Sequence, residues 1–162
     1  MSNDPNVFEP GPWEREFGPV RGTRLANAAG ASDLGCTLYE LDPGGQAAPY
    51  HVHHANEELL IVLDGTLELR TPAGPQEVAR GAVVAFRAGP DGAHRVRNTS
   101  SAPARYLVIS TMRFPELVQY PDAGTILAMK GPGDGLAFPA GSEGDYVALV
   151  REALAADPEV NG

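Results

Sequence analysis

The four histidines of this 162-residue chain lie in two short segments, and no other feature of the sequence constrains the fold more. Residues two positions apart in a β-strand point to the same face, so the imidazoles of His51 and His53 can reach one point in space. Glu58 opens the next apolar segment after a short loop, and a strand–loop–strand return would bring its carboxylate beside the two rings. The remaining isolated histidine begins a later strand-like segment. The sequence therefore predicts a metal site with four ligands: His51, His53, Glu58 and His94.

Three imidazoles and one carboxylate suit one divalent transition metal ion, with Fe, Mn, Ni, Zn and Co all open. Such an ion takes about six ligands, so about two positions would remain free for a substrate. His54 and Glu57 are the competing ligands. If the strand continues, His54 points away from the other two histidines of its segment, and Glu57 points outward. We interpret both as surface residues or as partners of the ligands.

Short apolar segments separated by turn residues recur along the chain, roughly every 8–12 positions, which is typical of an all-β sandwich or barrel. Glycine (19) and proline (15) are spread along the sequence and supply the turns. One segment, 145–156, has helical spacing instead. The expected strands are 34–41, 48–53, 58–63, 66–70, 76–79, 82–86, 93–98 and 105–112, followed by a weaker pair at 117–120 and 125–129.

Two motifs enclose the histidines, and both resemble the motifs of the cupin superfamily. The first matches that family at every position: Gly45, five residues, His51, Val52, His53, four residues, Glu58, six residues and Gly65. The second reads Gly81, five residues, Arg87, Ala88, Gly89, four residues, His94, three residues and Asn98. This second motif departs from the family pattern in two ways. Arg87 stands where the family has proline, and two extra residues separate Gly89 from His94.

The resemblance implies a double-stranded β-helix, the jelly-roll barrel of the cupins, here with a short C-terminal helix. We expect an N-terminal arm over 1–21, the barrel over 22–130, and a C-terminal extension that contains the helix over 131–162. Small cupins commonly form dimers, so the resemblance also implies a homodimer. Trp13 and Phe17 in the arm are the candidate contacts.

The superfamily includes dioxygenases, sugar isomerases, lyases and decarboxylases, as well as storage and sensing proteins, so the resemblance leaves the reaction open. We expect a metal-dependent enzyme acting on a small oxygenated molecule, with a dioxygenase-type oxidoreductase ahead of an isomerase or lyase acting on a sugar or organic acid. A non-catalytic binding or sensing protein is the alternative. No catalytic residue follows from the motifs. Alternation along the strands places Tyr39 and Tyr106 near the inner face, which makes them candidates for acid–base chemistry.

The net charge of −9 argues against a nucleic acid or an anionic membrane surface as partner, because such binding needs clustered Lys and Arg. A small-molecule ligand or substrate is the expected partner. The N-terminal residues lack the basic and apolar regions of a signal peptide, and no stretch of about 18 apolar residues occurs, so a cytoplasmic location is expected. Cys36 is the only cysteine, which fits a reducing compartment. We interpret it as an inert buried thiol, with a reactive or pocket-lining role as the alternative.

Overall fold

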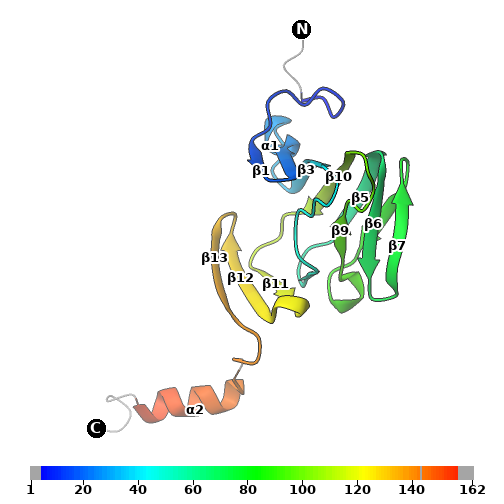
Figure 1. Cartoon of the computed structure of the whole chain (residues 1–162). Coiled ribbons are helices and arrows are strands. Elements are labelled where there is room, and N and C mark those ends of the chain that lie inside the picture. Colours follow the sequence, from blue (N-terminus) through cyan, green and yellow to red (C-terminus); the bar gives the residue numbers. More distant parts are fainter. Residues whose placement is uncertain (1–4, 143, 157–162) are drawn as a thin grey trace.

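The computed structural model describes residues 5–142 and 144–156, and antiparallel strands are the main secondary structure of this part of the chain (Figure 1). This confirms the all-β fold class. In chain order the strands are β1 (Arg15–Phe17), β2 (Val20–Arg24), β3 (Leu34–Leu41), β4 (Val52–His53), β5 (Glu58–Asp64), β6 (Thr66–Thr71), β7 (Gly74–Ala79), β8 (Val83–Phe86), β9 (Arg95–Arg97), β10 (Ala104–Thr111), β11 (Glu116–Tyr120), β12 (Thr125–Gly131) and β13 (Asp134–Pro139). The helices are α1 (Leu25–Ala28) and α2 (Tyr146–Ala156), with 3₁₀ turns η1 (Pro90–Gly92) and η2 (Pro121–Ala123).

Three sheets build the barrel. The largest has the order β1-β2-β3-β10-β5-β8, the smallest β7-β6-β9, and the third β13-β12-β11-β4. Strands distant in sequence are neighbours, since β10 pairs with both β3 and β5 over most of its length. Such crossovers between sheets are what a jelly roll requires, and they bring the two histidine segments to one end of the barrel.

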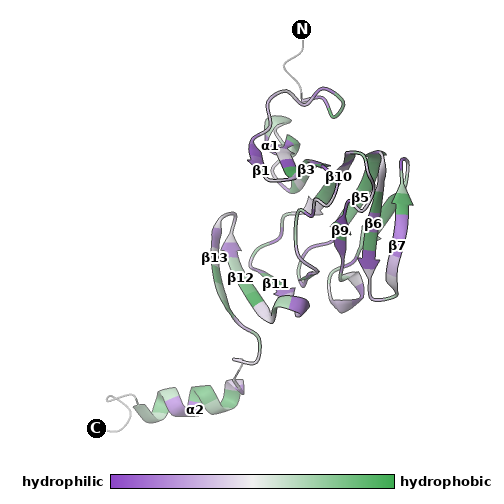
Figure 2. Ribbon diagram, viewed as in Figure 1, coloured by the Kyte–Doolittle hydropathy of each residue, from purple (hydrophilic) through white to green (hydrophobic). Residues whose placement is uncertain are grey.

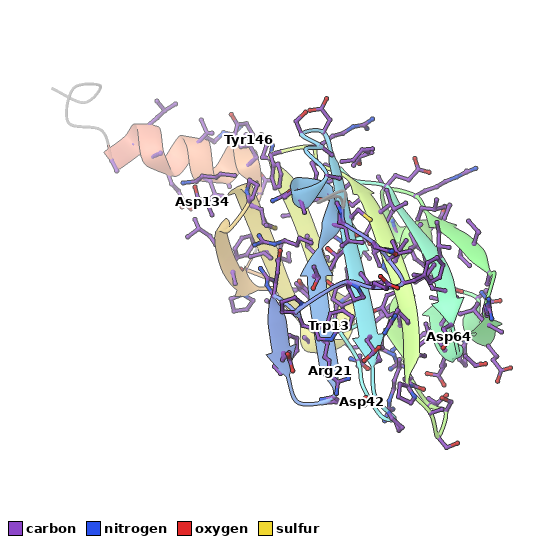
Figure 3. The ribbon with its side chains drawn as sticks, turned by 90° about the horizontal axis from the view of Figure 1, so that it is seen from above. Trp13, Arg21, Asp42, Asp64, Asp134 and Tyr146 are labelled. Atoms are coloured by element: carbon purple, nitrogen blue, oxygen red, sulfur yellow. The ribbon has the colours of Figure 1, made fainter. Side chains whose placement is uncertain are left out.

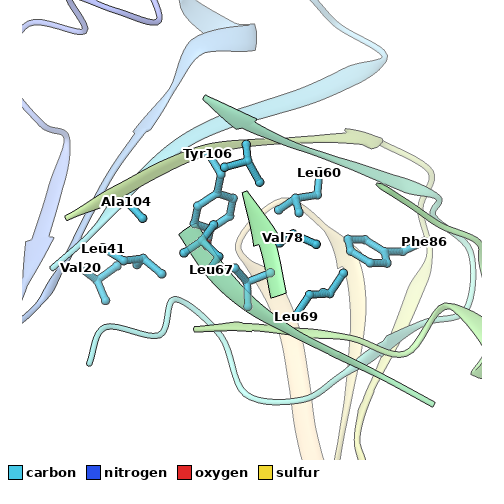
Figure 4. Packing of buried hydrophobic residues seen from close by; sticks show 11 residues of the cluster. Val20, Leu41, Leu60, Leu67, Leu69, Val78, Phe86, Ala104 and Tyr106 are labelled. Carbon is cyan, nitrogen blue, oxygen red and sulfur yellow. The ribbon is translucent and has the colours of Figure 1, made fainter. Parts of the chain in front are cut away.

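The main hydrophobic core fills the space between the six-stranded and three-stranded sheets (Figure 4). Leu60 and Val62 of β5 meet Leu67 and Leu69 of β6 there, and each of these side chains is at most 1% exposed. The tight turn between the two strands depends on Gly65, which has a φ of 75°. A Cβ at this position would lie 2.9 Å from that of Ala104, so both the conformation and the contact require glycine.

A second cluster covers the outer face of the large sheet. Leu38 and Leu107 point to this side, and Leu25 of α1 packs on them together with Trp13 (Figure 3). Tyr39 points the other way, toward the main core, which confirms the alternation expected along residues 34–41. Helix α1 has only four residues, too few to show helical periodicity, so sequence patterns did not reveal it.

The two ends of the chain continue the sheets. Strand β1 lies within the segment 1–21 expected as an arm, and β13 lies within the extension 131–162, where it pairs with β12. Residues 1–4, 143 and 157–162 of these segments are outside the described part. Helix α2 confirms the short C-terminal helix. It extends away from the barrel and has no buried residue, and most of its residues are apolar (Figures 1 and 2). Among the described residues, no helix is both long and apolar enough to cross a bilayer.

Candidate metal centre

The two histidine segments meet through their backbones. The N–H of His51 donates to the carbonyl of His94 at 3.0 Å, and the N–H of His94 donates back to His51 at 2.9 Å. His53 follows in β4, which pairs with β11. Glu58 begins β5, on the next stretch of chain. The strand–loop–strand return therefore places all four sequence-predicted ligands at one end of the barrel.

The side chains of the predicted ligands converge. One ligand atom from each of His51, His53 and Glu58 lies within 4.8 Å of the other two. His94 adjoins this group, because its Nε2 is 3.2 Å from the Glu58 carboxylate and its ring centroid is 4.4 Å from that of His51. His54 is exposed and lies outside this convergent group.

Each of the three histidines has its Nδ1 occupied by an oxygen acceptor. His51 Nδ1 donates to the carbonyl of Pro49 at 2.8 Å, and His94 Nδ1 donates to the carbonyl of Gly92 at 2.9 Å. His53 Nδ1 is 3.3 Å from a carboxylate oxygen of Glu116. A carbonyl only accepts, so the neutral ring must carry its proton on Nδ1 and leave the Nε2 lone pair free. Three Nε2 donors and one carboxylate fit a divalent transition metal ion.

The departures from the family motif support the ligands. The turn Pro90–Gly92 folds back so closely that a Cβ on Gly92 would lie 1.8 Å from the carbonyl oxygen of Arg87. Gly89, which opens this turn, donates its N–H to the carbonyl of His53 at 2.7 Å. The ring of Phe86 stacks on His94 with a centroid distance of 3.7 Å. The longer turn therefore contacts two of the ligands through its backbone, His53 through the N–H of Gly89 and His94 through the carbonyl of Gly92. Neither contact requires a proline at position 87.

Asn98, the last residue of the second motif, is fully buried and braces the barrel. Its Nδ2 donates to the carbonyls of Leu41 and Ala102, each at 2.8 Å. Its backbone N–H donates to the carbonyl of Gly45 at 2.9 Å. The two motifs are thus joined at two places. Asn98 bonds to Gly45 at one, and His51 pairs with His94 at the other.

Glu116 is part of this centre, although the sequence motifs gave no sign of it. Its side chain is buried, and one oxygen accepts the backbone N–H groups of His54 and Ala55 at 3.1 and 3.0 Å. The other oxygen accepts from Nδ2 of Asn56 and faces Nδ1 of His53. Glu116 thus fixes the loop between two ligands and orients one ligand ring.

The pKa values of His51 and Glu58 are shifted in the directions that favour binding of a cation. Burial, and after it the neighbouring His94, lower the pKa of His51 to about 4, so this ring is neutral at neutral pH. Burial alone would raise the pKa of Glu58, but contact with Nε2 of His94 and the positive charge that the three histidines carry when protonated outweigh burial and lower that pKa. Glu58 is therefore an anion beside the neutral ring of His51.

These shifts predict that the metal-free protein loses stability in acid. The unfolded chain binds a proton at a histidine near pH 6.5, whereas folded His51 does so only near 4, so the unfolded state is favoured as the pH falls between these values. The lowered pKa of Glu58 and that of Glu116 act in the same direction at lower pH. Thermal unfolding of chelator-treated protein should show a Tm that falls steadily from pH 7 to pH 4. A Tm that stays constant over this range would contradict the assignment.

A small chamber of about 80 Å³ lies directly over the centre. Tyr39 and Tyr106, the two candidate catalytic residues, both line it, and their rings stack with centroids 5.3 Å apart. Burial, then the charge of Glu58, raise the pKa of Tyr39, and burial raises that of Tyr106 well above 10. Both hydroxyl groups therefore keep their protons at neutral pH. A catalytic role for either stays a prediction.

The sequence matches the Cupin domain family over residues 37–110. Among solved structures, the chain is similar to a sugar phosphate isomerase of the cupin superfamily from Silicibacter pomeroyi, with 27% identity, coverage of 80% of this chain and 82% of that one, and a TM-score of 0.71. A candidate sugar phosphate isomerase from Acidithiobacillus ferrooxidans gives 25% identity, coverage of 78% and 80%, and a TM-score of 0.72. The polyketide cyclase RemF from Streptomyces resistomycificus, with 24% identity, coverage of 60% and 69% and a TM-score of 0.52, shares the fold. No curated protein matches.

Proposed function

We propose that this chain, which matches the Cupin domain family over residues 37–110, is a divalent-metal enzyme that isomerises a small, sugar-like hydroxy-carbonyl compound. The observation that carries the proposal is the convergence of three imidazoles and the Glu58 carboxylate beneath a chamber of about 80 Å³. The two solved structures described as sugar phosphate isomerases support this reaction class over others of the superfamily. The dioxygenase-type reaction expected from the sequence would use the same ligands, and it is the competing outcome of the test below.

A divalent ion held by these ligands would polarise a substrate carbonyl or hydroxyl oxygen and stabilise the charge that develops there during isomerisation. The residues of the chain supply the rest of the site. Tyr39 keeps its proton and can donate a hydrogen bond to a second substrate oxygen, since it lines the chamber beside Glu58. Tyr106 stacks on Tyr39 and restricts its ring, so that the donor is fixed before the substrate arrives.

Hydrogen exchange at carbon separates the two reactions. Metal-stripped full-length chain is reloaded separately with Fe(II), Mn, Co, Ni and Zn, and each form is incubated in D₂O with aldoses, ketoses and their phosphates. Isomerisation by proton transfer through an enediol exchanges the hydrogen on the carbon next to the carbonyl with solvent. For this route we expect NMR to detect the isomeric product with deuterium at that carbon, and neither in metal-free protein. Oxygen consumption by the Fe(II) form without deuterium incorporation would replace the isomerase by a dioxygenase. Metal binding without turnover of any compound would contradict both.

A further inference from the structure

A larger cavity adjoins the chamber on its outer side. It has a volume of about 420 Å³, a size typical of ligand sites, and it shares Tyr39, Glu58 and Val108 with the chamber. Its walls come from β1, β3 and β10 and from the turn between β12 and β13, and that turn contributes Pro132 and Gly133. A substrate with one end at the metal centre would extend past Tyr39 into this outer cavity.

The charge of the outer cavity is opposite to that of the protein. The chain as a whole has a net charge of −9, with 21 acidic and 12 basic residues. Yet the charged residues that line this cavity in the described part of the chain are Arg15, Arg24 and one carboxylate, Glu58, which is itself a proposed metal ligand. The walls away from the metal centre are therefore cationic, in a protein where a randomly placed charge would more often be negative.

Only one of these two arginines has a carboxylate partner. Nε of Arg24 is 3.0 Å from Glu14. None of the ion pairs between described residues includes Arg15. The charge of Arg15 nevertheless reaches the metal centre, because it opposes the rise in the pKa of Tyr39 that burial and Glu58 produce. The charges of Arg15 and Glu58 therefore both act on Tyr39. A substrate that spans the two cavities would pass Tyr39, with Glu58 at one end and Arg15 at the other.

We propose that Arg15 binds an anionic oxygen group of the substrate, a phosphate or a carboxylate, in the outer cavity while the oxygenated end of the molecule reaches the metal centre. The planar guanidinium group matches the geometry of either anion and can donate two hydrogen bonds to it. This inference rests on the proposed function and deepens it, since it assigns the substrate a charged group and gives that group a place.

Binding measurements test the proposal separately from turnover. Calorimetric titrations of the full chain, both Mn-loaded and metal-free, use three probes: a neutral hexose, its 6-phosphate and the corresponding hexuronate. We compare the natural protein with Arg15→Gln and with Arg80→Gln. Arg80 is exposed and lines neither cavity, so its variant removes the same charge elsewhere. Circular dichroism and the Tm check that both variants fold.

We expect at least one anionic probe to bind about 10- to 100-fold more tightly than the neutral hexose, in both metal states. Arg15→Gln should remove most of this preference, and Arg80→Gln should leave it unchanged. A preference for the phosphate alone or for the hexuronate alone identifies the anion. Equal binding of neutral and anionic probes, or a preference that survives in Arg15→Gln, would overturn the proposal. Because the titrations also use metal-free protein, the preference for anionic probes can be measured even if the protein catalyses no isomerisation.

Discussion

Replacing His53 or Glu58 is expected to abolish stoichiometric metal binding, whereas the same replacements one residue away should leave it intact. The chain offers matched pairs, since His54 follows His53 directly and Glu57 precedes Glu58. His54 and Glu57 are exposed, while the other two belong to the convergent group. Loss of a residue that merely supports a ligand typically weakens metal binding 10- to 100-fold, so loss of a ligand itself should exceed about a hundredfold.

Metal content after dialysis against one equivalent of Mn or Zn, together with competition against a chelator of known affinity, measures this effect. His53→Ala and Glu58→Gln should retain little metal, and His54→Ala and Glu57→Gln should match the natural protein. If His54→Ala lost as much metal as His53→Ala, the ligand set inferred from the geometry would be wrong. Comparable metal retention by all four variants would mean that the centre holds no resident ion.

The second large effect is expected at Glu116. Alanine there removes an acceptor of the backbone N–H groups of His54 and Ala55 and of the Asn56 amide. The N–H of His54 still has the carbonyl of Leu117 and the Asn56 amide that of Arg113, so the main loss falls on the N–H of Ala55. One unsatisfied donor costs about 1–3 kcal/mol, so Glu116→Ala should lower the free energy of unfolding by about that amount. Chemical denaturation of metal-free protein measures this, with the exposed Glu57→Ala as the control, which should change the free energy by less than about 0.5 kcal/mol.

Glu116→Gln separates stability from ligand orientation. Glutamine keeps one acceptor oxygen for the loop, but its amide nitrogen cannot accept the Nδ1 proton of His53. We expect a smaller loss of stability, about 1 kcal/mol or less, together with a 10- to 100-fold weaker affinity for the metal. If Glu116→Gln bound metal as tightly as the natural protein, Glu116 would serve the loop alone.

The ligands could be predicted because strand parity and motif spacing are local properties of the sequence. His51 and His53 share a face in any strand, and the motif glycines mark turns that need their conformations or close contacts, as at Gly65. Glu116 could not be predicted in this way. It lies 63 residues from its histidine partner, in a segment whose polar residues look like ordinary surface, and only the pairing of β11 with β4 brings the two together.

The cationic outer cavity was likewise hidden from sequence patterns. Arg15 belongs to a three-residue strand with an entirely exposed pattern, which reads as part of a charged arm. Its place in the wall of the outer cavity depends on the hairpin of β1 with β2, which puts β1 at the edge of the six-stranded sheet. The net charge of −9 argues against a nucleic acid or an anionic membrane surface as partner, but net charge does not show where individual arginines lie.

The paired backbones of His51 and His94 have a consequence for how the protein unfolds. An ion bound by these ligands would tie together three separate stretches of chain, so none of them can detach without releasing it. Metal occupancy and folding are then thermodynamically linked, and a free metal concentration one hundred times the Kd adds about 2.7 kcal/mol to the free energy of unfolding. Cellular metal supply would in that case set not only how much of the protein is active but also how long each molecule survives proteolysis.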